Sequence, residues 1–128
     1  MHTVMPELNT EIKDTHVVNK ASGRLAAEEF VSFISGHIDQ WAGKAVLWDI
    51  SDLDLTEVAS DDLRNYAHDT AAIVEVNRAG ERTAIYAPHD LQFGMAKAYT
   101  AFAENAAISI RYEVFRDIDE AMVWLNES

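Results

Sequence analysis

Residues able to bind a ligand or a partner gather where the sequence predicts strand ends and helix starts. The candidate binding residues are Asp49, Ser51, Asp52, Ser60, Pro88, His89, Phe93 and Gly94. In open α/β sheets, ligands bind in the crevice outside the carboxyl ends of the strands. We therefore expect these residues to form a binding surface at the carboxyl edge of a sheet.

One subset of these residues could support a reaction. Asp49, Asp52 and His89 combine carboxylate and imidazole groups, which bind divalent cations and suit a metal-assisted hydrolase. However, the histidines form no H-x-x-H or H-x-x-x-H pair, and the motifs G-x-S-x-G and G-x-x-x-x-G-K-[ST] are absent. A lone histidine beside a carboxylate is usually a solvated surface residue. We expect no enzyme, no cofactor and no metal site, with a weak hydrolase as the most distant alternative.

Acidic residues dominate the segment between the two halves of the chain. The carboxylates are Asp49, Asp52, Asp54, Glu57, Asp61 and Asp62, with no basic residue between them. They could bind a cation or a basic partner, but the glycine-centred spacing of a calcium loop is missing. A solvated loop before a helix is the favoured interpretation. Ser60 is then the expected N-cap, followed by acidic residues that favour the helix dipole.

Phe93 and Gly94 open the helix predicted over Asp90–Ala103. A functional interpretation has a ligand or partner backbone approaching Gly94, with Phe93 as an apolar lid. A structural interpretation has the glycine allowing close packing of helix on sheet, and we favour it because a glycine inside a helix usually has a packing reason.

Composition limits the function classes. The 128 residues are 48% hydrophobic, carry a net charge of -12 and include no cysteine. That charge repels nucleic acid and anionic lipid, and the missing cysteines exclude disulfides and thiolate sites. The N-terminus lacks the pattern of a signal peptide, and the longest uncharged stretch, Phe30–Ile38, is far short of the ~20 residues that span a bilayer. We expect a single cytoplasmic domain over residues 1–128 without membrane insertion.

Periodicity predicts an α/β fold with a mainly parallel sheet. Short β-branched or apolar runs predict strands at Met1–Leu8, Thr15–Lys20, Ala45–Ile50, Thr83–Ala87 and Ile108–Phe115. Amphipathic stripes predict helices at Arg24–Trp41, from Ser60 to Gly80, at Asp90–Ala103 and after a capping box at Asp117 and Glu120. Helical crossovers between the later strands imply parallel pairing, with antiparallel pairing at the N-terminal edge.

This order of elements resembles the SpoIIAA-like branch of the STAS, or anti-sigma-factor-antagonist, superfamily. The most specific stretches are VLWDI at Val46–Ile50, APHDLQFGMA at Ala87–Ala96 and VFRDIDEAMVWL at Val114–Leu125. The resemblance implies a small bacterial-type, non-enzymatic α/β domain with some likeness to CRAL-TRIO lipid-binding domains. It also implies a phosphoacceptor near a helix N-terminus, for which Ser60 is the matching residue. The D-S-x-G pattern of regulatory members is absent, and Asp61 and Asp62 would repel a phosphate.

These observations leave three functional hypotheses. The preferred one is a binding or regulatory module that acts on an unknown protein partner through the carboxyl edge. The second is a carrier of a small apolar or lipid-like ligand, held between the helices at Arg24–Trp41 and Asp90–Ala103. The third is the metal-assisted hydrolase. Apolar residues around Phe93 and Tyr99 further predict a homodimer with the Asp90–Ala103 helix near its interface.

Overall fold

The computed structural model describes residues 5–78, 80–106 and 110–127. Its strands are β1 (Glu7–Ile12), β2 (His16–Gly23), β3 (Ala45–Leu53), β4 (Arg82–Tyr86) and β5 (Arg111–Phe115). Its helices are α1 (Ala27–Trp41), α2 (Ser60–Arg78), α3 (Asp90–Ala106) and α4 (Ile118–Leu125). The strands form one sheet in the order β1-β2-β3-β4-β5, with β1 antiparallel to β2 and the other pairs parallel. The predicted α/β class, the parallel sheet and its antiparallel N-terminal edge are confirmed.

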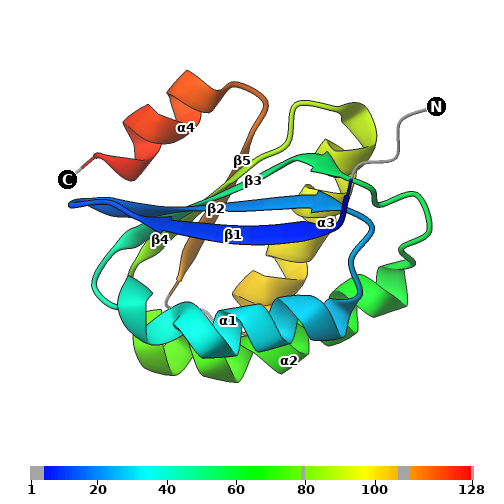
Figure 1. Cartoon of the computed structure of the whole chain (residues 1–128), viewed down its shortest axis with the longest axis horizontal. Helices are drawn as coiled ribbons and strands as arrows, with labels where there is room; N and C mark the ends of the chain where they lie inside the picture. The colour runs from blue at the N-terminus through cyan, green and yellow to red at the C-terminus, as the bar shows by residue number, and fades with distance from the viewer. Residues whose placement is uncertain (1–4, 79, 107–109, 128) are drawn as a thin grey trace.

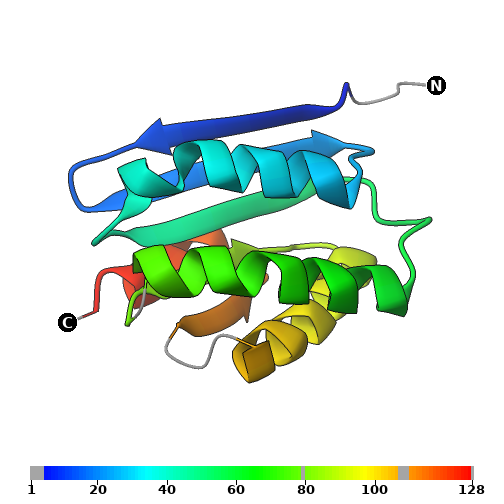
Figure 2. The same ribbon diagram turned by 90° about the horizontal axis from the view of Figure 1, so that it is seen from below.

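Sheet order determines where the helices lie. Because neighbouring parallel strands are consecutive in the chain, each right-handed crossover leads in the same direction and leaves its helix on the same face. The helices α1, α2 and α3 accordingly cover one face, and α4 covers the other after β5 (Figure 1). Figure 2 shows α1 and α2 side by side across the sheet.

The strand β3 shows why a continuous apolar run suits the centre of this sheet. Side chains alternate between the two faces of a strand. Val46 therefore packs with Ile34, Ile38 and Trp41 beneath α1, whereas Leu47 packs with α4 residues on the opposite face. Both faces of this part of the strand are covered, which explains its apolar sequence.

Several predicted element boundaries are wrong. The edge strand begins at Glu7 rather than at the start of the chain, and its polar sequence ELNTEI was not recognised because only one face of an edge strand is covered. The strand β3 continues through Ser51 and Asp52 to Leu53, because Gly23 and Ser22 of β2 still pair with it there across a register shift. The predicted start of the last strand, residues 108–109, lies outside the described residues.

Helix starts agree with the sequence in one case and differ in another. Asp117 caps α4, and its side chain accepts hydrogen bonds from the amides of Asp119 and Glu120. Ser60 is not an N-cap, because α2 begins at that residue and the Ala59 carbonyl accepts the first helical bonds. The Asp62 carboxylate in turn accepts from the Ala59 amide at 3.1 Å. The structure thus has a carboxylate of the first turn bonded back to the residue before the helix, in place of the predicted Ser60 cap.

None of the helices within the described ranges combines the length and the hydropathy needed to cross a membrane.

Candidate functional site

A cavity of about 500 Å³ lies between α1, α2 and the sheet face that they cover. Its walls are mainly apolar, and include Phe30, Ile34 and Ile38 of α1, Leu63 and Tyr66 of α2, and Trp48, Ile50 and Ile85 of the sheet. The helix α3 adds Met95, Ala96 and Tyr99. Clefts of roughly 300–1,000 Å³ with predominantly apolar walls are typical binding sites for small molecules.

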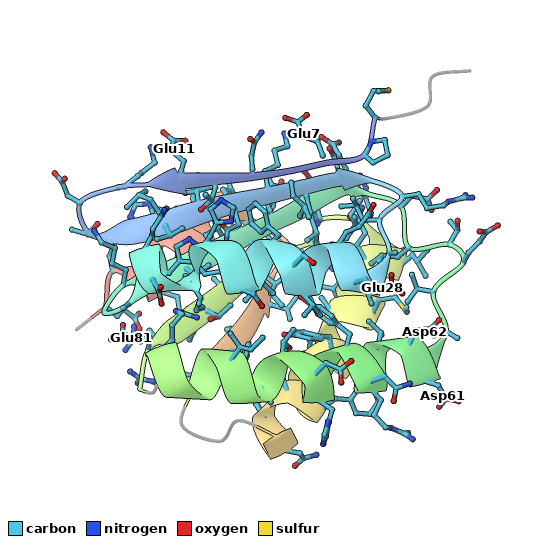
Figure 3. The ribbon with its side chains drawn as sticks, turned by 60° about the horizontal axis from the view of Figure 1, so that its bottom comes forward. Glu7, Glu11, Glu28, Asp61, Asp62 and Glu81 are labelled. Carbon is cyan, nitrogen blue, oxygen red and sulfur yellow. The ribbon has the colours of Figure 1, made fainter. Side chains whose placement is uncertain are left out.

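Most of the exposed residues that line the cavity lie at the carboxyl edge of the sheet, so we infer that its mouth opens there. Arg24, in the connection after β2, pairs with Asp54 at 3.0 Å and with Glu57 at 3.2 Å in the loop after β3. Hydrogen bonds from Thr56, together with Arg24, lower the pKa of Asp54 to about 2. This end is acidic, as Glu28, Asp61 and Asp62 show in Figure 3. The rim is therefore polar and charged, and its loops from two crossovers are held together by exposed ion pairs.

The opposite end of the cavity is closed and contains a buried arginine. Arg78, the last residue of α2, is 4% exposed and lines the cavity beside Thr83, Ile38 and Trp41. Its guanidinium donates to the Thr83 hydroxyl at 2.6 Å, the Arg82 carbonyl at 2.7 Å and the Lys44 carbonyl at 3.1 Å. Its Nε atom has no hydrogen-bond partner. Burial lowers the pKa of Arg78 to about 10.

Tyrosines form the wall between α2 and α3. Tyr66 and Tyr99 lie 5.4 Å apart between ring centroids, and Tyr99 meets Tyr112 of β5 edge-on at 6.1 Å. Burial raises the pKa of Tyr66 well above its ordinary value. Burial also raises the pKa of Tyr99, although hydrogen bonds with Thr70 and Tyr112 oppose the rise. These hydroxyl groups put polar atoms into an otherwise apolar wall.

We predict that Tyr66 and Tyr99 stay un-ionised above pH ~10 in the folded protein, where unfolded tyrosine ionises. Their raised pKa values contribute stability that is present below pH ~10 and is lost as the pH rises through the folded values. Tyrosinate absorbance during an alkaline titration measures this directly, with protein in concentrated urea as the control. Ionisation of every tyrosine near pH 10 while the fold persists would contradict the prediction.

The candidate residues of β3 lie outside the cavity walls. Asp49 accepts hydrogen bonds from the Ser51 amide and hydroxyl at 3.0 and 2.7 Å, and Asp52 pairs with Lys20 of β2 at 3.5 Å. By the alternation of β3, Asp49 shares its face with Leu47, opposite α1 and α2. Because β3 continues to Leu53, Asp49 lies within the strand rather than at its end, and it accepts hydrogen bonds from Ser51 of the same strand.

The candidate residues after β4 are also absent from the cavity. Pro88 is half-buried and His89 is exposed before α3 begins. Phe93 lies under the guanidinium of Arg116, 4.4 Å from its ring centroid, and the same arginine pairs with Asp90 at 2.7 Å. Phe93 also packs on the core cluster that contains Ala96, so it acts as packing rather than as a lid.

The prediction that Gly94 allows close packing of its helix on the sheet is wrong. The residue is exposed, and a Cβ atom built on it would meet nothing within 4 Å. No tight helix-to-sheet approach therefore explains this glycine. Ser60 is likewise exposed, at the start of α2. The structure thus brings Asp49 and Ser51 into contact but does not gather the eight candidates into one site.

Within the described ranges, no three histidine or carboxylate side chains gather closely enough to hold a metal ion. Asp49, Asp52 and His89, the set considered for a hydrolase, do not form such a group.

Sequence reasoning missed the polar residues that shape the cavity. Arg78, Tyr66 and Thr70 line or support its wall, and Gln92 of α3 ties down the end of β3 near its mouth. One signal was present: Tyr66 and Thr70 interrupt the apolar stripe of α2 at positions that face the core. No local signal distinguishes Arg78, because an arginine in the last turn of a helix is expected on dipole grounds alone.

Comparison with known proteins supports the fold. No protein-family model matches the chain, and no curated protein does. A solved structure from Shewanella loihica PV-4, an uncharacterised DUF3478 family protein with a SpoIIAA-like fold, aligns with a TM-score of 0.55 at 20% sequence identity. The alignment covers 98% of this chain and 95% of that one. The sheet order, the helix placement and this alignment together show that the chain has a SpoIIAA-like fold.

Proposed function

We propose that this protein is a non-enzymatic binding module that holds a small, mainly apolar ligand in the cavity between α1 and α2. The observation that carries this proposal is the cavity itself, with a volume of about 500 Å³ and walls built from side chains of both helices and the sheet. It exceeds the roughly 300 Å³ needed for a small ligand. The sequence predicted that the helix α3 would face α1 across the ligand, whereas α2 supplies most of that wall of the cavity.

The position of the mouth supports the same function. It opens at the carboxyl edge of a parallel sheet, which is where open α/β folds bind ligands. A ligand entering between Arg24 and Glu57 would part exposed ion pairs, which contribute little to stability. Entry therefore disturbs the rim rather than the core.

A partner protein at the carboxyl edge has weaker support and stays a prediction. Asp49, Asp52 and Phe93 already contact Ser51, Lys20 and Arg116 within the chain. The homodimer also stays a prediction. Of the apolar residues proposed for its interface, Leu91 is 48% exposed, whereas Tyr99 packs internally against Tyr66 and Tyr112.

We predict that Leu63→Trp lowers the affinity for a neutral apolar probe, N-phenylnaphthylamine, by about tenfold or more. Leu63 is half-buried and lines the cavity, so a larger indole there occupies the space that the probe needs. Probe fluorescence, excited outside tryptophan absorption, gives the affinity.

The matched control is Leu91→Trp, because Leu91 is exposed on α3 and does not line the cavity. This variant should bind the probe like the parent protein. Equal affinity for the parent and Leu63→Trp, or no binding by the parent, would overturn the proposed function.

A further inference from the structure

Among the described residues, no carboxylate lies within 4.0 Å of the buried guanidinium of Arg78, although the more distant Glu81 favours its charged form. Of the other arginines, those at positions 24, 64, 82 and 116 each have a carboxylate within 4.0 Å, and Arg111 is exposed to water, whereas Arg78 is buried. Arg78 is satisfied by a hydroxyl and two carbonyls, which are neutral acceptors. A buried charge is normally paired, because an unpaired one loses its hydration without compensation.

Arg78 lines the cavity, and one donor of its guanidinium is buried without a partner. Nε is the one guanidinium nitrogen without a partner, and Arg78 is among the residues lining the closed end of the cavity. The hydroxyl and carbonyl contacts explain a residue that ties the end of α2 to β4. They do not balance its positive charge, since all three acceptors are neutral.

We propose that the ligand is a monoanionic amphiphile whose carboxylate pairs with the guanidinium of Arg78, with its apolar part lying between α1 and α2. This assignment rests on the proposed cavity function and specifies the ligand class. Charge-assisted hydrogen bonds from arginine to carboxylate are among the strongest in proteins, and the dry surroundings of Arg78 strengthen them further. The lowered pKa of Arg78 has the same physical origin, because burial removes water from the cation.

Charge balance favours a carboxylate over a phosphate. One cation neutralises one negative charge, and a dianion at this depth would leave a second charge buried in a protein whose net charge is already -12. The apolar residues between Arg78 and the mouth, including Ile34, Trp48 and Ile50, suit a hydrocarbon rather than a polar tail. The carboxylates at the mouth lie in water, where salt screens their repulsion beyond roughly 8 Å.

The test compares decanoate with decanol, which share a chain and differ in the charged group. Using protein stripped of co-purified lipid, displacement of N-phenylnaphthylamine gives both affinities. We expect decanoate to bind at least about tenfold more tightly than decanol. The variant Arg78→Met, which keeps an unbranched apolar stem but removes the charge, should bring the two affinities within about threefold of each other.

The control Arg64→Met makes the same change in net charge at an exposed residue outside the cavity, and it should preserve the preference for decanoate. Decanoate binding no better than decanol, or an unchanged preference in Arg78→Met, would overturn the assignment while leaving the apolar cavity function intact. Absence of binding by the probe and both ligands would overturn the cavity function as well. If Arg78→Met does not fold, the ratio of the decanoate and decanol affinities in the parent protein decides whether the assignment holds.

Discussion

Replacing Trp41 with alanine should lower the free energy of unfolding by about 3–5 kcal/mol, the usual cost of removing a buried tryptophan. Trp41 is 2% exposed at the end of α1, and its indole meets the Trp48 ring edge-on at 6.1 Å. Its Nε1 atom donates to the Thr10 hydroxyl at 3.1 Å and so ties α1 to the edge strand β1. The loss should be visible as a lower urea midpoint in far-ultraviolet circular dichroism.

The variant Trp41→Phe separates the contributions to this effect. It retains an aromatic ring against Trp48 and Phe33 but cannot donate to Thr10, so a smaller loss is expected. Because Trp41 also lines the closed end of the cavity beside Arg78, the alanine variant should enlarge the ligand space. A loss below ~1 kcal/mol in Trp41→Ala would show that the surrounding side chains collapse into the vacated volume.

The backbone architecture was predictable because its determinants are local. Apart from Asp49, the run AVLWDI at 45–50 is apolar on both faces, which is typical of a covered strand, and the helical stripes before and after it require crossovers. Right-handed crossovers then determine the helix faces. The end of β3 was not predictable, because Ser51 and Asp52 are polar and remain in the strand only through pairing with β2 across a register shift.

The position of the site was predictable only in part. The rule for open α/β sheets correctly indicated the carboxyl edge, where the mouth lies, but the expected residues were those nearest the strand ends in sequence. The cavity walls come instead from residues such as Phe30, Ile38 and Tyr66, whose spacing is that of ordinary core positions. Whether facing stripes close completely or leave a cavity depends on the separation of two helices, which periodicity does not encode.

Gln92 illustrates the same difficulty and leads to a second large effect. It follows the predicted strand end closely and lies beside Phe93, yet its role is invisible until α3 is placed against β3. Its Nε2 atom donates to the carbonyls of Ser51 and Leu53 at 3.0 and 2.9 Å, and its side chain is buried. It thereby satisfies two backbone acceptors where β3 leaves the sheet ladder near the cavity mouth.

The variant Gln92→Ala should lose roughly 2–4 kcal/mol of stability, because two carbonyls lose their donor and the side chain leaves a void. The matched variant Gln92→Glu keeps the shape but presents an acceptor to those carbonyls when ionised. Burial raises the pKa of such a carboxyl, so its protonated form, which can donate to one carbonyl, persists at low pH. The stability of Gln92→Glu should therefore come closest to that of the parent protein at pH ~4, and it should fall below it as the pH rises through the folded pKa of the new carboxyl. Urea unfolding at each pH measures this difference. Equal stability of the parent and both variants at pH 7 would show that water, rather than Gln92, satisfies the end of β3.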